Sequence, residues 1–131
     1  MKRFSAVAVL VVAALLVVSA LAMAAQPVPG GIYTGKSTAN DRVFIDVFNN
    51  GRKVKVAKVK DRCGVTWRIR RLEIDNRGRF SGRQTDGSGD LVFKIRGRFV
   101  ERRQITGRID DTTCKSRESR SYAASFDRRG S

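Results

Sequence analysis

Short runs of alternating apolar and polar residues follow one another from Ile32 to the end of the chain, separated by Gly, Asn and Asp. A period of two is typical of half-buried strands, and no segment here keeps a helical period over a useful length. Eight runs predict eight strands: Ile32–Lys36, Arg42–Asn49, Arg52–Lys60, Val65–Ile74, Arg79–Gln84, Asp90–Val100, Gln104–Asp110 and Ser121–Asp127. The pattern predicts an all-β antiparallel meander, closed as a small barrel or folded as a sandwich.

The segment RVFIDVFNNGRKVKVAKV, residues 42–59, predicts the first hairpin. Its Asn50-Gly51 pair favours a two-residue type I′ turn. That turn sets four cross-strand pairs: Asn49 with Arg52, Val47 with Val54, Ile45 with Val56 and, on the other face, Asp46 with Lys55.

The segment LVFKIRGRFVERRQITGRID, residues 91–110, predicts a second hairpin, whose two apolar faces must be in register. The inward pairs are Phe99–Ile105, Gly97–Gly107 and Ile95–Ile109, and the outward pairs are Lys94–Asp110, Arg98–Thr106 and Arg96–Arg108. The last pair joins two like charges, which is mildly destabilising and suggests compensation by an external anion.

Arg-Gly-Arg-Phe occurs twice, at 77–80 and 96–99. Around the first copy, Asp75 to Gly78 fits a type I turn with Gly in the left-handed position of a bulge. In the second copy, Gly97 lies in mid-strand on the inward face, where glycine marks a bend or close packing. Both copies keep the strand alternation, so we interpret them as fold-forming segments and not as a nucleic-acid-binding tail.

The N-terminus has the three parts of a secretory signal peptide: Met1-Lys2-Arg3, an uncharged apolar run to Ala22, and small residues. We predict a signal peptide at 1–25, cleaved near Ala24 or Ala25, a short linker at 26–31 and one domain at 32–131. A retained membrane anchor is the alternative, since the run approaches the length of a spanning helix. The mature chain is expected to be secreted, extracellular or periplasmic, with no transmembrane segment.

Cys63 and Cys114 both lie in the exported part of the chain. In an oxidising compartment, an even pair in a small domain predicts one disulfide. Closing this loop would stabilise the fold by roughly 4 kcal/mol in the chain-entropy model. The alternative is two buried free thiols.

Charge is the strongest compositional signal. Without Lys2 and Arg3 the chain has 25 basic and 12 acidic residues, a net charge of +13. Such a domain is attracted to polyanions, which include acidic envelope polymers, anionic lipid headgroups and nucleic acid. Solubility alone is the other explanation of a high net charge.

Many of the basic residues occupy the polar phase of predicted strands, where they would form one outward positive surface able to bind phosphate or carboxylate. The candidate anion-binding residues are Lys53, Lys55, Arg68, Arg70, Lys94, Arg96, Arg98 and Arg108. Few aromatic residues share this phase, chiefly Phe44 and Phe48, whereas Trp67, Phe93, Phe99 and Phe126 are expected in the core. A base-stacking surface is therefore not supported, and no sequence-specific nucleic-acid partner is expected.

Enzymatic chemistry has little support in this sequence. The chain has no histidine, which excludes Ser-His, Cys-His and His-ligated metal sites. The nearest carboxylate pairs, Asp86 with Asp90 and Asp110 with Asp111, fit turns better than catalytic pairs, and the DGSGD segment lacks the later ligands of a calcium loop. We predict a non-enzymatic protein without cofactor or metal. The main alternative to polyanion binding is storage or transport of a small ligand in a closed barrel, with room beside Gly97 and Gly107.

The order GIYTGKS, Cys63, IDNRGRFSG, a second GRF, ITGRI, Cys114 and SYAASF resembles small exported bacterial all-β proteins with no assigned activity. The resemblance spans nearly all of the mature chain, through short motifs of mostly Gly and aromatic residues. It implies an exported all-β domain with one disulfide, and it implies no catalytic residue or ligand.

Overall fold

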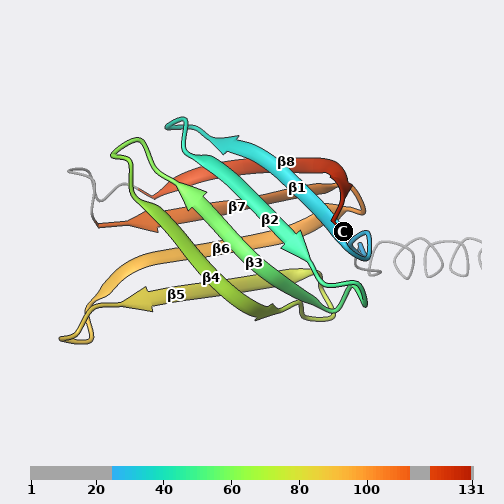
Figure 1. The fold of residues 1–131 in the computed structure, drawn as a ribbon, viewed down its shortest axis with the longest axis horizontal. Helices are drawn as coiled ribbons and strands as arrows, with labels where there is room; N and C mark the ends of the chain where they lie inside the picture. The colour runs from blue at the N-terminus through green and yellow to red at the C-terminus, as the bar shows by residue number, and fades with distance from the viewer. Residues whose placement is uncertain (1–24, 113–118, 131) are drawn as a thin grey trace, which may run out of the picture.

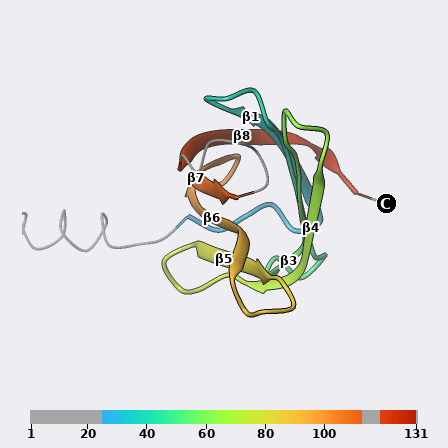
Figure 2. The same cartoon turned by 90° about the vertical axis from the view of Figure 1, so that its left-hand side faces the viewer.

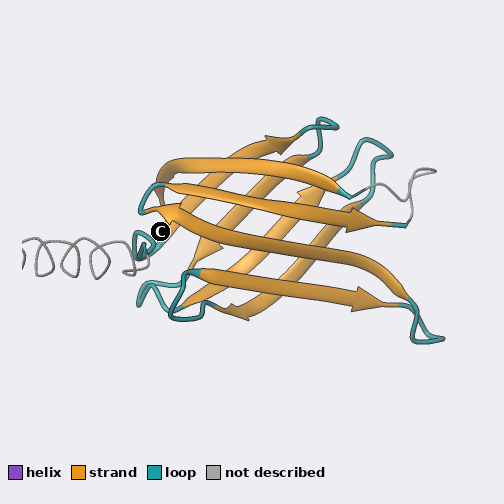
Figure 3. Ribbon diagram, turned by 180° about the vertical axis from the view of Figure 1, so that it is seen from behind, coloured by secondary structure: helices purple, strands orange, loops and turns teal. Residues whose placement is uncertain are grey.

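The computed structural model describes residues 25–112 and 119–130. Within them the chain forms strands and loops and no helix (Figure 3). The strands are β1 (Gly31–Ser37), β2 (Arg42–Val47), β3 (Lys53–Lys60), β4 (Thr66–Glu73), β5 (Arg79–Thr85), β6 (Leu91–Glu101), β7 (Gln104–Asp111) and β8 (Arg120–Arg129). All neighbouring pairs are antiparallel, in the order β4-β3-β2-β1-β8-β7-β6-β5.

The sheet curls into a nearly closed barrel. Strands β1 to β4 cross β5 to β8 at an angle (Figure 1), and the view from one end shows the strands surrounding a common interior (Figure 2). The two end strands, β4 and β5, are not hydrogen-bonded to each other. Side chains close the seam between them, because Ile69 and Leu72 pack so tightly on Gly82 that a Cβ there would lie 2.8 Å from each.

The predicted all-β antiparallel meander is confirmed, and the barrel is the form it takes. No strand end differs by more than two residues from the alternation in the sequence. The second hairpin is confirmed in full, since β6 and β7 align Phe99 with Ile105, Gly97 with Gly107 and Ile95 with Ile109, and all three predicted outward pairs are present. The turn after β4 is also as predicted: Gly78 has a φ of 74°, and its N–H donates to the Asp75 carbonyl at 3.0 Å.

The first hairpin was predicted correctly only in part. Val47 does face Val54, but Ile45 faces Ala57 and Asp46 faces Val56, because a bulge shifts the register between Asp46 and Val47. The type I′ turn was wrong as well. Gly51 has a positive φ and Asn50 does not, and the Gly51 N–H donates to the Phe48 carbonyl at 2.9 Å. The loop therefore starts one residue earlier than a two-residue turn would.

An irregularity shared by β3 and β4 reverses which side chains face the core. In β3 the buried positions change from Val54 to Ala57 and Val59, and in β4 they change from Trp67 to Leu72. The change in β4 occurs at Arg71, which has a φ of 59°. Bulges of this kind increase the local twist and bend of a strand, which helps this half of the sheet to close.

Aromatic and β-branched side chains fill the interior of the barrel. Trp67 stacks on Phe93 with ring centroids 5.1 Å apart, and Tyr33 meets Phe99 edge-on at 5.3 Å. The predicted core positions Trp67, Phe93 and Phe99 are buried, and Phe126 is partly buried against the same cluster.

Residues 25–30 lie against one end of the barrel. Val28 is buried, and its N–H donates to the Tyr33 hydroxyl at 2.9 Å, which in turn donates to the Arg102 carbonyl at 2.5 Å. The segment predicted as a linker is thus packed, and β1 already begins at its last residue, Gly31. The predicted signal peptide lies outside the described residues except for Ala25, which packs against the core.

Cys63 lies in the exposed turn between β3 and β4 and is not a free cysteine. Cys114 lies outside the described residues, so the Cys63–Cys114 pairing stays a prediction.

Candidate anion-binding site

A groove of about 760 Å³ crosses the outer face of β5, β6 and β7 and reaches the end of β4. Five arginines line it: Arg71, Arg79, Arg96, Arg98 and Arg108. The backbones of Gly97 and Gly107 also line it. We call this the arginine groove.

Strand register places four of these arginines in two rows. Arg79 aligns with Arg98, which aligns with Thr106, and two residues further along the strands Ser81 aligns with Arg96 and then with Arg108. Residues two apart on a strand are about 6.8 Å apart on the same face. Between the rows the two facing glycines present only backbone outward, so the arginines stand on either side of a shallow floor.

The arginines differ in how far the protein itself neutralises them. Arg79 Nε lies 3.1 Å from Asp75 Oδ2, Arg96 lies 4.0 Å from Asp110, and Arg108 Nε donates to Ser119 Oγ at 2.9 Å. The like charges of Arg96 and Arg108 are therefore partly offset within the protein, and an external anion is not required for the pair to form.

Asp75 is held in its charged form by the turn that precedes β5. The backbone N–H of Arg79 donates to its carboxylate at 2.9 Å, and the N–H of Arg77 donates at 2.8 Å. These hydrogen bonds lower the pKa of Asp75 below its usual value, with the Arg79 N–H as the largest contribution. Asp75 therefore fixes Arg79 at the edge of the groove over a wide pH range.

Arg71 and Arg98 form no side-chain hydrogen bond or ion pair with any described residue. Arg71 is also in the left-handed backbone region, with a φ of 59°, where a non-glycine residue other than Asn or Asp is uncommon. Unfavourable backbone conformations persist where the surrounding structure imposes them, and they concentrate at binding sites. An exposed arginine held in this way beside four others is the most unusual feature of the groove.

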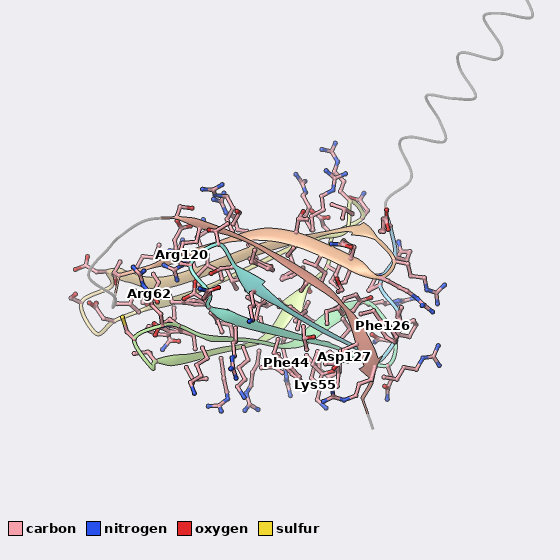
Figure 4. All side chains as sticks on the ribbon, turned by 90° about the horizontal axis from the view of Figure 1, so that it is seen from above. Phe44, Lys55, Arg62, Arg120, Phe126 and Asp127 are labelled. Carbon is pink, nitrogen blue, oxygen red and sulfur yellow. The ribbon has the colours of Figure 1, made fainter. Side chains whose placement is uncertain are left out.

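A second groove, of about 460 Å³, crosses the outer face of β1, β2 and β3. Phe44 is half-buried in it. Four cations surround it: Lys36, Arg42, Lys58 and Lys60. None of these four forms an ion pair with a described residue. We call this the Phe44 groove. Figure 4 shows Phe44 on the same side of the molecule as Lys55, and basic side chains point outward from the barrel.

The structure brings together only three of the predicted anion-binding residues, Arg96, Arg98 and Arg108. The other five lie outside both grooves. Lys53 is 3.8 Å from Glu73, Lys55 stands at the β3 bulge, and Lys94 is half-buried between Arg83 and Asp110. Arg68 and Arg70 are exposed on the outer face of β4.

The sequence interpretation missed six groove residues: Lys36, Arg42, Lys58, Lys60, Arg71 and Arg79. Strict alternation places Lys58 on the same face as Val54, and only the bulge after Val54 turns it outward. Arg71 becomes part of the groove through its left-handed conformation, which the sequence does not signal. Lys36 and Arg42 could have been found from alternation, because both flank inward-facing residues of regular strands.

The interior space predicted beside Gly97 and Gly107 is occupied. A Cβ on Gly97 would lie 2.3 Å from Phe80 Cζ, and one on Gly107 would lie 2.6 Å from Tyr122 Cε1. The phenyl and phenol rings therefore fill the gap on which the small-ligand interpretation depended. Neighbouring side chains use the room that these glycines provide.

A buried ionic cluster lies at the barrel end where β1 turns into β2, β3 turns into β4 and β8 begins. It consists of Asp41, Asp61, Asp111 and Arg120. Arg120 Nε lies 2.6 Å from Asp41, and Arg120 Nη2 lies 3.9 Å from Asp111, which also accepts a hydrogen bond from Trp67 Nε1 at 3.3 Å. This cluster was not predicted.

Asp61 and Asp111 are hydrogen-bonded to each other, which requires one of the two carboxyls to carry a proton. Burial raises the pKa of Asp61, and the neighbouring Asp111 raises it further. Paired carboxylates can serve as acid and base, but neither carboxylate lines either groove. We assign the cluster a structural role, which is to connect the β1–β2 and β3–β4 turns to the end of β7 and the start of β8.

The DGSGD segment, residues 86–90, forms a turn that is stabilised by hydrogen bonds among its own residues. Asp86 Oδ1 accepts hydrogen bonds from the Ser88 and Asp90 backbone N–H groups at 2.9 and 3.1 Å, and the Ser88 hydroxyl lowers the pKa of Asp86.

Within residues 25–112 and 119–130, no group of three or more Cys, Asp or Glu side chains is placed to hold a metal ion. No helix in the described part of the chain is long and apolar enough to cross a membrane.

The chain matches no known family model, no curated protein and no solved structure.

Proposed function

We propose that the protein is an exported, non-catalytic binding module that holds anionic envelope polymers on its outer face, with the arginine groove as the principal site. One observation carries the proposal: Arg71, Arg79, Arg96, Arg98 and Arg108 converge on one groove, and two of them have no side-chain partner among the described residues. The planar guanidinium group can bind a phosphate or carboxylate through two parallel hydrogen bonds. Repeated anionic groups along a polymer would engage several arginines at once.

The net charge of the chain supports the same interpretation. Without Lys2 and Arg3 the net charge of +13 attracts polyanions over long range. Charge alone would give only diffuse attraction, whereas the two aligned rows provide fixed positions for anionic groups. The filled interior gives no support to storage of a small ligand inside the barrel.

The test is retention of the mature protein on an immobilised anionic polymer, heparin or a teichoic-acid matrix, at increasing salt. Binding through several ion contacts should weaken steeply as salt rises, because each contact releases counterions. Retention that hardly changes with salt would contradict the proposal.

A matched pair of triple variants locates the site. Arg96→Gln, Arg98→Gln and Arg108→Gln together should shift elution to markedly lower salt and reduce the salt dependence of binding. The control carries Arg83→Gln, Arg102→Gln and Arg129→Gln, three exposed positions outside the groove, and removes the same charge. Equal losses in the two variants would show that net charge alone determines binding, and not the groove.

A further inference from the structure

One cross-strand row of residues passes through both grooves. Following the strand register from β4 to β5 gives Thr66, Lys60, Arg42, Lys36, Ala123, Thr106, Arg98 and Arg79, one residue from each strand. Every member after Thr66 is exposed. We call this row the basic belt, and it contains five cations and no carboxylate.

The belt is a shared wall of the two grooves. Lys36, Arg42 and Lys60 line the Phe44 groove, whereas Arg79, Arg98 and Thr106 line the arginine groove. The Phe44 groove lies on one side of the belt, toward Phe44 and Lys58. The arginine groove lies on the other side, toward Arg96 and Arg108. A chain running along both grooves must therefore cross the belt between them.

The crossing point is where the belt has its smallest side chains. Ala123 of β8 stands between Lys36 of β1 and Thr106 of β7. The outward residues of β8 on either side, Ser121 and Ser125, are small and exposed too. In Figure 1, β8 lies beside β1 and links the two groups of strands that carry the grooves. The side chains of the belt therefore protrude least at Ala123, where a bound chain would pass over it.

Four of the five belt cations have no counter-charge within residues 25–112 and 119–130. Lys36, Arg42, Lys60 and Arg98 form no ion pair with a described residue, and only Arg79 has one, with Asp75. Neighbouring strands are about 4.8 Å apart, so eight strands give the belt a contour of about 34 Å. This is far longer than a single anion and suits a linear polymer.

The shape of the belt restricts the class of polymer. The belt follows the curl of the barrel, so its ligand must bend sharply within this contour, which a stiff nucleic-acid duplex with a persistence length of about 50 nm resists. Single-stranded nucleic acid is bound through several stacking aromatic rings. Here the grooves contain one half-buried ring on the outer face, that of Phe44.

We propose that one flexible, single-chain phosphodiester polymer without stacking groups, such as an envelope poly(glycerol phosphate), occupies both grooves at once and crosses the belt at Ala123. This inference rests on the proposed function and specifies its ligand. The arginine groove holds one segment through bidentate phosphate contacts. The Phe44 groove holds the next segment through point charges, with aliphatic carbons against the ring. Joining the two segments raises the effective concentration of the second once the first is bound.

The test compares glycerol phosphate oligomers of two lengths by titration calorimetry. A short oligomer spans about 10 Å, the distance across three neighbouring strands, and a long one exceeds the contour of about 34 Å. The long oligomer should bind about 100-fold more tightly, with one chain per protein. An oligothymidylate with the same number of phosphates should bind no more tightly, and tighter binding would overturn the choice of polymer class.

Ala123→Glu places a carboxylate at the crossing point. It should weaken binding of the long oligomer about tenfold or more and change binding of the short oligomer less than about twofold. Leu91→Glu is the control, since Leu91 is 40% exposed and lies outside both grooves, so it adds the same charge elsewhere. If Ala123→Glu does not fold, Ser125→Glu places the charge on the next outward position of β8, which is exposed and lines neither groove.

The two proposals fail in different ways. If the short oligomer binds through Arg96, Arg98 and Arg108 but lengthening it adds nothing, the belt is wrong and the arginine groove stands. The belt is also wrong if Ala123→Glu and Leu91→Glu weaken the long oligomer equally. If neither oligomer binds in a salt-dependent way, the proposed function itself is wrong.

Discussion

Gly97 of β6 faces Gly107 of β7, and the phenol ring of Tyr122 fills the inward space that the two missing side chains leave. A Cβ on Gly107 would lie 2.0 Å from the Arg96 carbonyl oxygen, and one on Gly97 would lie 2.5 Å from the Tyr122 hydroxyl. The absence of side chains therefore admits the aromatic rings of Phe80 and Tyr122 on the inside. On the outside these two inward-facing positions present backbone to the floor of the arginine groove.

Gly97→Ala should destabilise the protein by about 1–3 kcal/mol, because the added methyl group overpacks the interior against Phe80 and Tyr122. Urea unfolding followed by Trp67 fluorescence measures the change. Gly87→Ala is the control, since a Cβ at Gly87 meets nothing within 4 Å and its φ is not positive. Equal stability of the two variants would show that Gly97 is not needed for packing.

Tyr122→Phe should stabilise the protein by about 1 kcal/mol. The Tyr122 hydroxyl is buried and has no hydrogen-bond partner among the described residues, and burial raises the pKa of this side chain. Removing an unsatisfied buried hydroxyl removes its desolvation cost without losing a hydrogen bond. The same unfolding assay tests this, and a loss of stability would indicate a partner for the hydroxyl in solution. Combined with Gly97→Ala, Tyr122→Phe should also relieve part of the overpacking.

Arg71→Gly should raise the stability and weaken polymer binding in the same molecule. Glycine adopts the left-handed conformation at little cost, whereas other residues lose roughly 1–2 kcal/mol there. The change also removes one of the two groove arginines that form no side-chain hydrogen bond or ion pair with a described residue. Thermal unfolding and heparin retention together measure the two effects.

Arg70→Gly is the control for this trade-off. Arg70 pairs with Val56 in the regular part of β4 and has no positive φ, so glycine there should cost about 0.5–1 kcal/mol. Arg70 also lies outside both grooves, so binding should change less. Stabilisation by both changes, or by neither, would mean that the conformation of Arg71 is not strained.

Asp61→Asn should stabilise the protein at neutral pH and have little effect below about pH 4. Because burial raises its pKa, the Asp61 carboxyl favours folding in its neutral form, and that contribution is lost as the pH rises through the folded-state value. An amide keeps the acceptor for the Cys63 and Val65 N–H groups and can donate to Asp111. The measurement is the free energy of unfolding between pH 3 and pH 8, roughly the range of carboxyl titration.

Asp86→Asn is the comparison of opposite sign. The pKa of Asp86 is lowered by the Ser88 hydroxyl, so its charged form favours folding, and that stability is lost as the pH falls. The two variants should therefore diverge from the wild type in opposite directions at neutral pH. Parallel curves would contradict the assignment of the shared proton to the Asp61–Asp111 pair.

Local patterns predicted the fold wherever the strands are regular. The β6–β7 register followed from matching two apolar faces, and the Asp75–Gly78 turn followed from Gly in a left-handed position. The β2–β3 register was wrong beyond Val47, because an extra residue in β3 reverses the alternation. A bulge depends on how the whole sheet bends, and a single sequence does not show it.

The candidate site was predicted less completely than the fold. Arg96, Arg98 and Arg108 were found because one hairpin fixes them, whereas Arg71 joins them across the seam of the barrel. The buried ionic cluster was not predicted from the sequence, because it too depends on tertiary contacts. Asp41 and Asp61 lie in turns, where aspartate is ordinary, and the tertiary fold brings Asp41 to Arg120 and Asp61 to Asp111.

The barrel is not closed by a continuous hydrogen-bonded sheet, because its end strands β4 and β5 are not hydrogen-bonded to each other. Ile69 and Leu72 of β4 pack on Gly82 of β5, while β4 is hydrogen-bonded to β3 and β5 to β6. Because no strand-to-strand hydrogen bonds join β4 to β5, we expect local opening between them to require less free energy than global unfolding. Arg71 and Arg79 stand on opposite sides of this opening. A polymer bound to both Arg71 and Arg79 would hold the edges of β4 and β5 together. Backbone hydrogen exchange at these two edges should therefore slow when the polymer binds.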